Sequence, residues 1–210
     1  MQTEKQAITS QEAQICEALG RTEALGTENG LNGKEQLHLR LLAEELIGMM
    51  RGVTDEAHAE YWVEQEGRKY ILHLSSDVKL NRKMREQILA VSSTGANVAA
   101  KGFMGKLKDM ISTAFLPADE YSVAPLSGLS LGLMSMASNS SPQAQQASVN
   151  TLNWSMQRYK SAIEADGAGS QEVKMEKKAE LEHSIVASIA DEVTVSVKGS
   201  HVEIQIYKAF

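Results

Sequence analysis

Apolar and polar residues alternate in four short segments of this chain, and the segments fall into two neighbouring pairs. The first pair covers residues 57–65 and 70–75, separated by a turn around Gly67. The second pair covers residues 193–197 and 202–207, separated by the turn sequence K-G-S-H. Such alternation is typical of strands with one buried and one solvated face, and short turns join antiparallel neighbours. The pattern therefore predicts two antiparallel hairpins.

Apolar residues recur at intervals of three and four elsewhere in the chain, which is the period of an amphipathic helix. The clearest helix is predicted at 36–51, before the first hairpin. Further helices are expected at 11–19, 82–91, 106–115, 152–164 and 174–189. Helices and hairpins in this order predict an α+β fold, a two-layer sandwich in which helices pack on one face of an antiparallel or mixed sheet.

A Gly/Asn-rich run between residues 26 and 33 divides the chain. Residues 1–33 are expected to form an N-terminal arm or a short helix, and residues 34–210 a single α+β domain. The length of 210 residues fits one larger domain or a domain with appendages. A flexible loop is expected at 117–150, a stretch that includes a Ser-, Gly- and Met-rich segment at 126–142.

Composition and charge limit the classes of partner. The formal net charge of −6 argues against a nucleic-acid binder, which needs a basic excess to neutralise phosphates. The chain has no run of about 18 apolar residues, so we expect no membrane span. The N-terminal segment lacks an apolar signal core, and the single Cys16 suits a reducing compartment, so we expect a cytoplasmic protein. The histidines show no metal-binding spacing, and no metal site is predicted.

The candidate chemistry lies in residues 92–105, which read S-S-T-G-A-N-V-A-A-K-G-F-M-G. Glycines let backbone N–H groups approach a ligand closely, and a helix N-terminus after such a loop favours an anion. We therefore interpret the segment as a phosphate-facing loop, although it matches no strict phosphate-binding signature. Its candidate ligand-binding residues are Gly95, Asn97, Lys101, Gly102 and Gly105.

The order of helix, hairpin, Asp, glycine loop, helix and late hairpin resembles the GHKL ATPase domain of histidine kinases, gyrase and anti-sigma kinases. The helix L-R-L-L-A-E-E-L-I-G-M-M resembles the family's N-box helix, with Glu45 at the place of its glutamate. The strand Y-I-L-H-L-S-S-D resembles the one that ends in the adenine-binding Asp, here Asp77. K-G-F-M-G-K-L resembles the second glycine motif, with Gly102 and Gly105 as its glycines. The resemblance implies an adenine nucleotide, ATP or ADP, as ligand.

Two departures from the family pattern concern the metal and the phosphates. The family places a magnesium-binding Asn four residues after the Glu, whereas this chain has Met49 there, and counting from Glu44 gives Gly48. The glycines expected after Asp77 are replaced by V-K-L-N. Without a metal clamp, transfer of a γ-phosphate loses its main charge stabilisation. We therefore expect weak or metal-independent nucleotide binding and no efficient ATP hydrolysis or kinase activity.

Each candidate residue also has a structural interpretation. Glu45 is a common helix former, Asp77 is placed to cap a following helix, Lys101 can stay solvated, and Asn97 suits a left-handed turn. The first function that fits is a regulatory GHKL-like domain that binds a partner protein and an adenine nucleotide, in the manner of anti-sigma factors. The alternative is a structural or protein-interaction domain with no small-molecule site, which binds a partner protein or forms a homo-oligomer.

Overall fold

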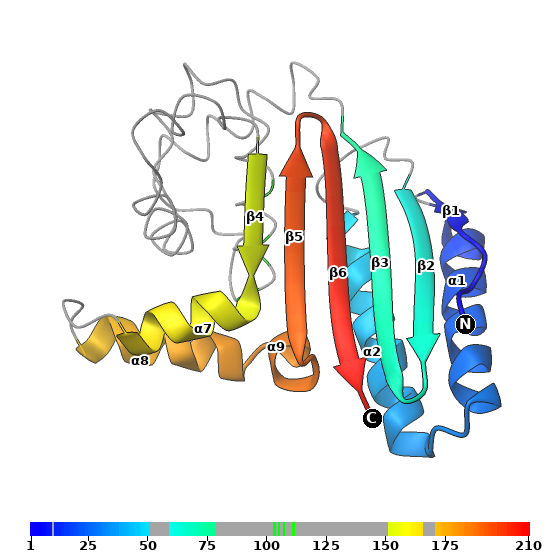
Figure 1. Ribbon diagram of the computed structural model, residues 1–210, viewed down its shortest axis with the longest axis horizontal. Helices are drawn as coiled ribbons and strands as arrows, with labels where there is room; N and C mark the ends of the chain where they lie inside the picture. Colours follow the sequence, from blue (N-terminus) through cyan, green and yellow to red (C-terminus); the bar gives the residue numbers. More distant parts are fainter. Residues whose placement is uncertain are drawn as a thin grey trace.

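The computed structural model describes residues 1–9, 11–50, 59–78, 103, 105, 107, 111, 151–165 and 171–210. The described strands are β1 (Gln6–Ile8), β2 (Ala59–Glu66), β3 (Lys69–Asp77), β4 (Thr151–Ser155), β5 (Glu192–Lys198) and β6 (His201–Ala209). The described helices are α1 (Glu12–Glu28), α2 (Gly33–Met50), α7 (Met156–Ala165), α8 (Gln171–Glu182) and α9 (Ile185–Ile189). The strands form one six-stranded sheet in the order β1-β2-β3-β6-β5-β4, and helices pack against it (Figure 1). The predicted α+β class is therefore confirmed.

Both predicted hairpins are present, and they form the centre of the sheet. β2 and β3 turn at Gly67, and β5 and β6 turn at Gly199, with positive φ angles of 60° and 63° that side chains rarely tolerate. The second strands of the two hairpins, β3 and β6, pair along the full length of β3. Every neighbouring pair in the sheet is antiparallel. The early and late hairpins therefore belong to one sheet.

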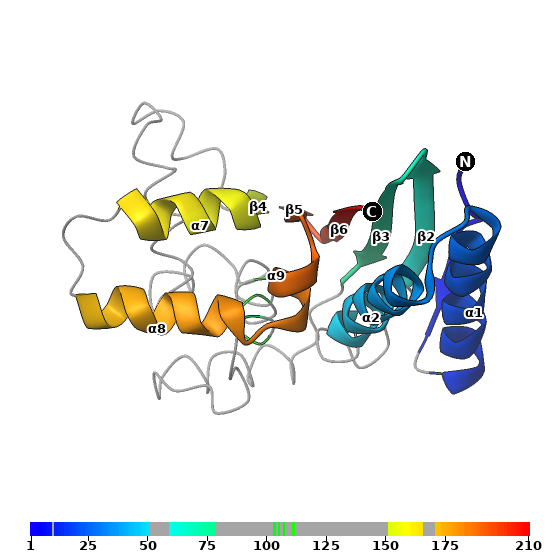
Figure 2. The ribbon, with the colours of Figure 1, turned by 90° about the horizontal axis from the view of Figure 1, so that it is seen from below.

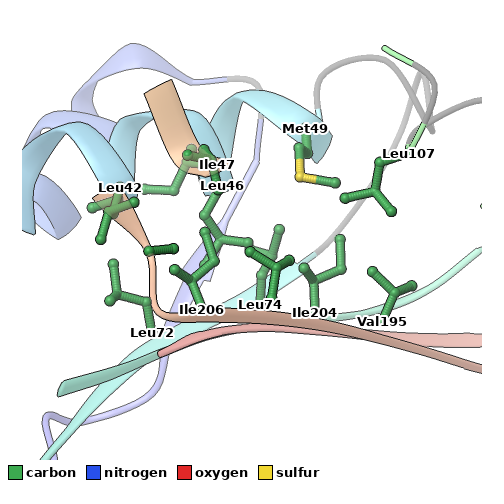
Figure 3. Close-up of a cluster of buried hydrophobic side chains, with 14 of the residues drawn as sticks. Leu42, Leu46, Ile47, Met49, Leu72, Leu74, Leu107, Val195, Ile204 and Ile206 are labelled. Carbon is green, nitrogen blue, oxygen red and sulfur yellow. The ribbon is translucent and has the colours of Figure 1, made fainter. Parts of the chain in front are cut away.

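One face of the sheet is apolar, and α2 packs against it. The buried residues on this face are Tyr61, Val63, Tyr70, Leu72, Leu74, Leu152, Trp154, Val193, Val195, Val197, Val202, Ile204 and Ile206. α2 contributes Leu42, Leu46, Ile47 and Met49 to the same cluster (Figure 3). α2 and α9 lie on the same side of the sheet (Figure 2). Burying one large aliphatic side chain contributes roughly 1.5–3 kcal/mol, so this layer supplies most of the driving force for folding.

The helix predicted at 36–51 is confirmed, and it begins earlier, at Gly33. Asn32 precedes it, and its side-chain oxygen accepts hydrogen bonds from the backbone N–H groups of Lys34 (3.0 Å) and Glu35 (3.1 Å). The Glu35 carboxylate accepts in return from the Asn32 N–H (2.9 Å). This reciprocal arrangement is a capping box, which satisfies N–H groups that have no partner within the helix. The cap explains the earlier start.

The helix predicted at 11–19 was too short, because α1 continues through Gly20 and Gly26 to Glu28. The predicted break began at Gly26, but this glycine is buried within α1. A Cβ atom added there would lie 3.3 Å from side-chain carbons of both Leu31 and Leu39. The missing side chain therefore allows α1 to approach the following loop and α2 closely, and the glycine serves packing rather than a turn.

Two further helix predictions were wrong in part. The segment at 152–164 begins as strand β4, in which Trp154 faces the core and pairs with β5, and helix α7 starts only at Met156. The segment at 174–189 is two helices, α8 and α9. Ser184 separates them, because its hydroxyl accepts from the Ala187 N–H (3.3 Å) and so caps α9. Pairing with β5 decided the first boundary, and the Ser184 cap decided the second.

The first nine residues extend the sheet at the edge of β2. The Thr3 N–H donates to the Val63 carbonyl (2.9 Å), and the Gln65 N–H donates to the Met1 carbonyl (2.7 Å). β1 then pairs with the start of β2, and α1 follows it and packs on α2. Residues 1–33 thus supply an edge strand and a long helix to the same body. The predicted helix at 82–91 and loop at 117–150 lie outside the described residues.

None of the described helices is long and apolar enough to cross a membrane.

Candidate functional site

Most of the predicted phosphate-facing loop lies outside the described residues, namely Gly95, Asn97, Lys101 and Gly102. The described residues of the adjoining segment, Phe103, Gly105, Leu107 and Ile111, are all helical. Phe103, Leu107 and Ile111 are buried, and Gly105 is half-buried. Helical structure therefore appears earlier than the predicted start at 106, and it includes Gly105, which we had placed in the loop.

Glu45 lies half-buried on α2, between the exposed Glu44 and the fully buried Leu46. The Glu44 carboxylate pairs with Arg40 (2.8 Å), one turn earlier on the same helix. Met49 is buried, and its thioether points into the core toward Leu107 (Figure 3). The position that would hold magnesium in the GHKL family thus carries an apolar side chain that belongs to the core.

Asp77 ends β3 and points away from α2. Its neighbours Ser76 and Val78 are buried, whereas the Asp77 side chain is 73% exposed. The Asp77 carboxylate accepts a hydrogen bond from Nδ1 of His201 (3.1 Å), which lies directly opposite on β6. Since successive strand residues face opposite sides, Asp77 lies on the face remote from Glu45. The structure therefore does not bring these two candidates together.

His201 also approaches Ser75, because its Nε2 lies 3.2 Å from the Ser75 hydroxyl. Ser75, His201 and Asp77 therefore have the connectivity of a Ser–His–Asp triad. An acyl-transfer site also needs backbone or side-chain donors aimed at an oxyanion. β3 pairs with β2 on one side and β6 on the other, so the amides around Ser75 are used in the sheet. We interpret this triple as an exposed cross-strand polar contact.

A second cluster lies on the same face, which we call the outer face because it is opposite the apolar layer. Its centre is a stacked pair, Trp62 on β2 and His73 on β3, with ring centroids 4.6 Å apart and planes 7° apart. Only 7% of Trp62 and 6% of His73 is exposed. We define the outer-face cluster as Lys5, Glu60, Trp62, Glu64, His73 and Glu203. The sequence did not predict this aromatic pair.

His73 lies between two carboxylates. Glu64 is 3.6 Å from Nε2 and Glu203 is 3.7 Å from Nδ1, which is ion-pair distance but beyond hydrogen-bond distance. Neither ring nitrogen has a hydrogen-bond partner among the described residues. Burial lowers the pKa of His73 below its ordinary value, and the two glutamates oppose that shift without cancelling it. The ring is therefore predominantly neutral at neutral pH.

Lys5 covers the other part of the cluster. Its ammonium nitrogen lies 4.2 Å from the centroid of the Trp62 ring and 3.4 Å from the Glu60 carboxylate. A cation over an indole face is attracted by the ring quadrupole, and the carboxylate adds a charge of opposite sign. The N-terminal segment thus places one cation on the aromatic pair.

A separate groove of about 370 Å³ lies among α7, α8 and α9, at the end of the molecule opposite α1 (Figure 1). Its lining combines Lys160 and Lys178 with Glu164 and Glu182, beside apolar side chains such as Leu181. The two signs of charge balance, so the lining does not select a ligand of one charge. Neither Glu45 nor Asp77 lines it.

Among the described residues, no three His, Cys, Asp or Glu side chains are placed to hold a metal ion. Comparison with models of protein families, with curated proteins and with solved structures finds no match to this chain.

Proposed function

We propose that this chain is a cytoplasmic regulatory domain with a GHKL-like two-layer fold. It binds a partner protein, takes an adenine nucleotide as its small ligand, and does not hydrolyse ATP efficiently. The observation that supports this proposal best is the pairing of β3 with β6 beneath α2. It joins the early helix and hairpin to the late hairpin in one sheet, which is the order of elements that the family resemblance requires.

The nucleotide part of the proposal assigns roles to the residues identified in the sequence. Asp77 orients the purine, and its exposed carboxylate is accessible for that contact. Lys101 and the loop glycines face the phosphates. The buried Met49 supports binding that does not depend on magnesium, because a thioether in an apolar core is a poor ligand for a hard cation.

A second candidate function is a protein-interaction domain with no small-molecule site, which binds a partner protein or a second copy of the chain. The orientation of Asp77 favours it, since that carboxylate lies on the outer face and contacts His201 instead of facing α2. In this case Asp77 stabilises the β3–β6 pairing and binds no ligand.

Calorimetric and thermal-shift titrations with ATP, ADP and GTP, each with and without magnesium, separate the two functions. Ligand at 100 times its Kd adds about 2.7 kcal/mol to the stability of the folded state. That stabilisation corresponds to a rise in Tm of roughly 5–10 °C for a chain of this length. We expect adenine nucleotides to bind alike with and without magnesium.

The variant Asp77→Asn tests the residue assigned to the purine. Its control is Glu66→Gln, an exposed residue of β2. We expect weaker nucleotide binding in Asp77→Asn and unchanged binding in the control. Binding that strictly requires magnesium would contradict the interpretation of Met49. The lack of any shift at millimolar nucleotide would leave the protein-interaction function.

A further inference from the structure

We propose that the outer-face cluster is a docking site for a lysine- or arginine-bearing segment of a partner protein. This inference rests on the partner-protein part of the proposed function and not on its nucleotide part. It names the chemistry of the partner and the surface that meets it. The site is built by β2, β3 and β6, so it exists only because the two hairpins share one sheet.

The charge of the cluster selects a cation. Glu60, Glu64 and Glu203 surround the aromatic pair, and their side chains are 58%, 44% and 35% exposed. Glu64 and Glu203 have no lysine or arginine of the described chain within ion-pair distance. Glu64 also accepts a hydrogen bond from the indole N–H of Trp62 (3.4 Å), and Glu203 accepts one from the side-chain amide of Gln205 (2.8 Å). Both donors are neutral, and the His73 ring is predominantly neutral at neutral pH. No lysine or arginine among the described residues therefore pairs with these two negative charges.

His73 gives a second, independent indication of a ligand. A buried polar atom without a partner costs free energy, so buried imidazole nitrogens are normally hydrogen-bonded. Here both nitrogens of a ring that is 6% exposed lack a partner in the part of the chain that the structure describes. A guanidinium or ammonium group that bridges toward Glu64 or Glu203 would bring donors to the edge of this ring.

Lys5 shows what kind of group fits the site. Its ammonium group lies over Trp62 and contacts Glu60. In the free protein, Lys5 thus occupies the position that a cation of the partner would take. The Lys5 side chain is 52% exposed and comes from the N-terminal segment rather than from the sheet core. A partner's cation can therefore displace it without disturbing the apolar layer.

A protein segment fits this surface better than a phosphate-bearing ligand does. Three carboxylates repel phosphate groups, while lysine and arginine side chains are attracted to the carboxylates and to the indole face. The cluster extends across three neighbouring strands: Glu60 and Glu64 lie four residues apart on β2, and Glu203 on β6 is level with Glu60 across Ser75 of β3. A partner segment with several basic residues can match these three carboxylates.

The test uses the full chain and a fluorescein-labelled peptide of alternating arginine and serine, with a glutamate–serine peptide as the charge-reversed probe. Fluorescence anisotropy at physiological salt measures both. Glu64→Gln/Glu203→Gln should weaken binding of the arginine peptide about tenfold. The control Glu12→Gln/Glu28→Gln removes two exposed carboxylates from α1 and should change it less than about twofold.

A second pair of variants tests whether Lys5 occupies the position that the partner's cation would take. Lys5→Ala should tighten binding about threefold, because it exposes Trp62 and frees Glu60. Lys69→Ala removes the same charge from an exposed position of β3 that does not touch Trp62, and it should have a smaller effect. Circular dichroism verifies that each variant is folded, and the indole N–H signal of Trp62 should shift when the peptide is added to the unmodified chain.

Equal weakening by the two double variants, or equal effects of the two lysine variants, would overturn the inference. So would an unmoved Trp62 signal at saturating peptide. These outcomes are independent of the nucleotide titrations. Nucleotide binding without specific capture of the arginine peptide overturns this docking site alone. Specific capture without nucleotide binding supports the docking site and removes only the nucleotide from the proposed function.

Discussion

Helix α1 contains two glycines, and only one of them contacts another element. Gly20 is exposed and has nothing within 4 Å of an added Cβ atom. Gly26 is buried, and its added Cβ atom would lie 3.3 Å from carbons of Leu31 and Leu39. Alanine at each position is therefore a matched pair, because both changes add the same methyl group to the same helix.

The expected effects have opposite signs. Replacing glycine by alanine inside a helix stabilises the protein by roughly 0.5–1 kcal/mol, and Gly20→Ala should gain this amount. Gly26→Ala should gain the same stability from helix propensity but lose more stability through overpacking, because Leu31 and Leu39 must both move. Overpacking of a core typically costs about 1–3 kcal/mol, so Gly26→Ala should lose roughly 0.5–2 kcal/mol net.

Urea denaturation followed by far-ultraviolet circular dichroism measures both differences, and thermal melts provide a second measurement. A change of 1 kcal/mol moves Tm by about 2–4 °C in a chain of this length. A loss of stability in Gly20→Ala would show that α1 does not continue through that position. An equal gain of stability in both variants would show that Gly26 does not lie against Leu31 and Leu39.

Three further predictions concern the core, a helix cap and pH. Leu46→Ala should cost about 2–5 kcal/mol in urea denaturation, because Leu46 is fully buried, whereas Leu37→Ala at an exposed position of the same helix should stay within about 0.5 kcal/mol. Asn32→Ala should cost about 0.5–2 kcal/mol in the same assay through loss of the α2 cap, and Asn32→Ser should restore most of it. The stability of the protein should fall as pH decreases below 6.5, because burial lowers the pKa of folded His73 and the unfolded chain binds the proton first. Stability measured from pH 7.5 to 5 should depend less on pH in His73→Gln, and an unchanged slope would contradict this assignment.

The sequence predicted those parts of the fold that depend on the regular spacing of apolar residues along the chain. Alternation located both hairpins and their inward faces, and the three-and-four spacing located α2. These signals are strong because each apolar layer repeats over a whole element and needs no knowledge of distant contacts. The pairing of β3 with β6 joins residues more than 120 positions apart, as in Asp77 opposite His201, and no local pattern specifies such a pairing.

Prediction failed where a local signal had a tertiary cause. Gly26 resembled a break, but it is a contact between α1 and its neighbours. The segment that starts at Leu152 has apolar spacing compatible with a helix, and pairing with β5 makes it a strand. Ser184 interrupts a continuous helical pattern because its hydroxyl caps the next helix. In each case, packing or hydrogen bonding with another residue outweighs the intrinsic preference of the segment.

The candidate site depends more strongly than the fold on the pairing register of the strands, because the register decides on which face of the sheet each side chain lies. Asp77 was identified from its place after a strand, but its orientation depends on which residues of β3 face inward, and Ser76 occupies the inward position. The outer-face cluster was missed because its residues are far apart in the chain. Trp62 lies opposite His73, and Glu203 lies near that ring from β6, only in the observed strand order.

The two faces of the sheet have separate roles: the inward face forms the core, and the outer face carries the proposed docking site. A shift of one residue in the register of β3 would move Leu72 and Leu74 out of the core and His73 into it, so the apolar layer fixes the register. That same register places His73 beside Trp62 and between Glu64 and Glu203. The core thus positions the outer-face cluster without sharing side chains with it. Substitutions of the exposed outer-face glutamates therefore test partner binding, while substitutions on the inward face test folding, and the two effects can be measured independently in the same protein.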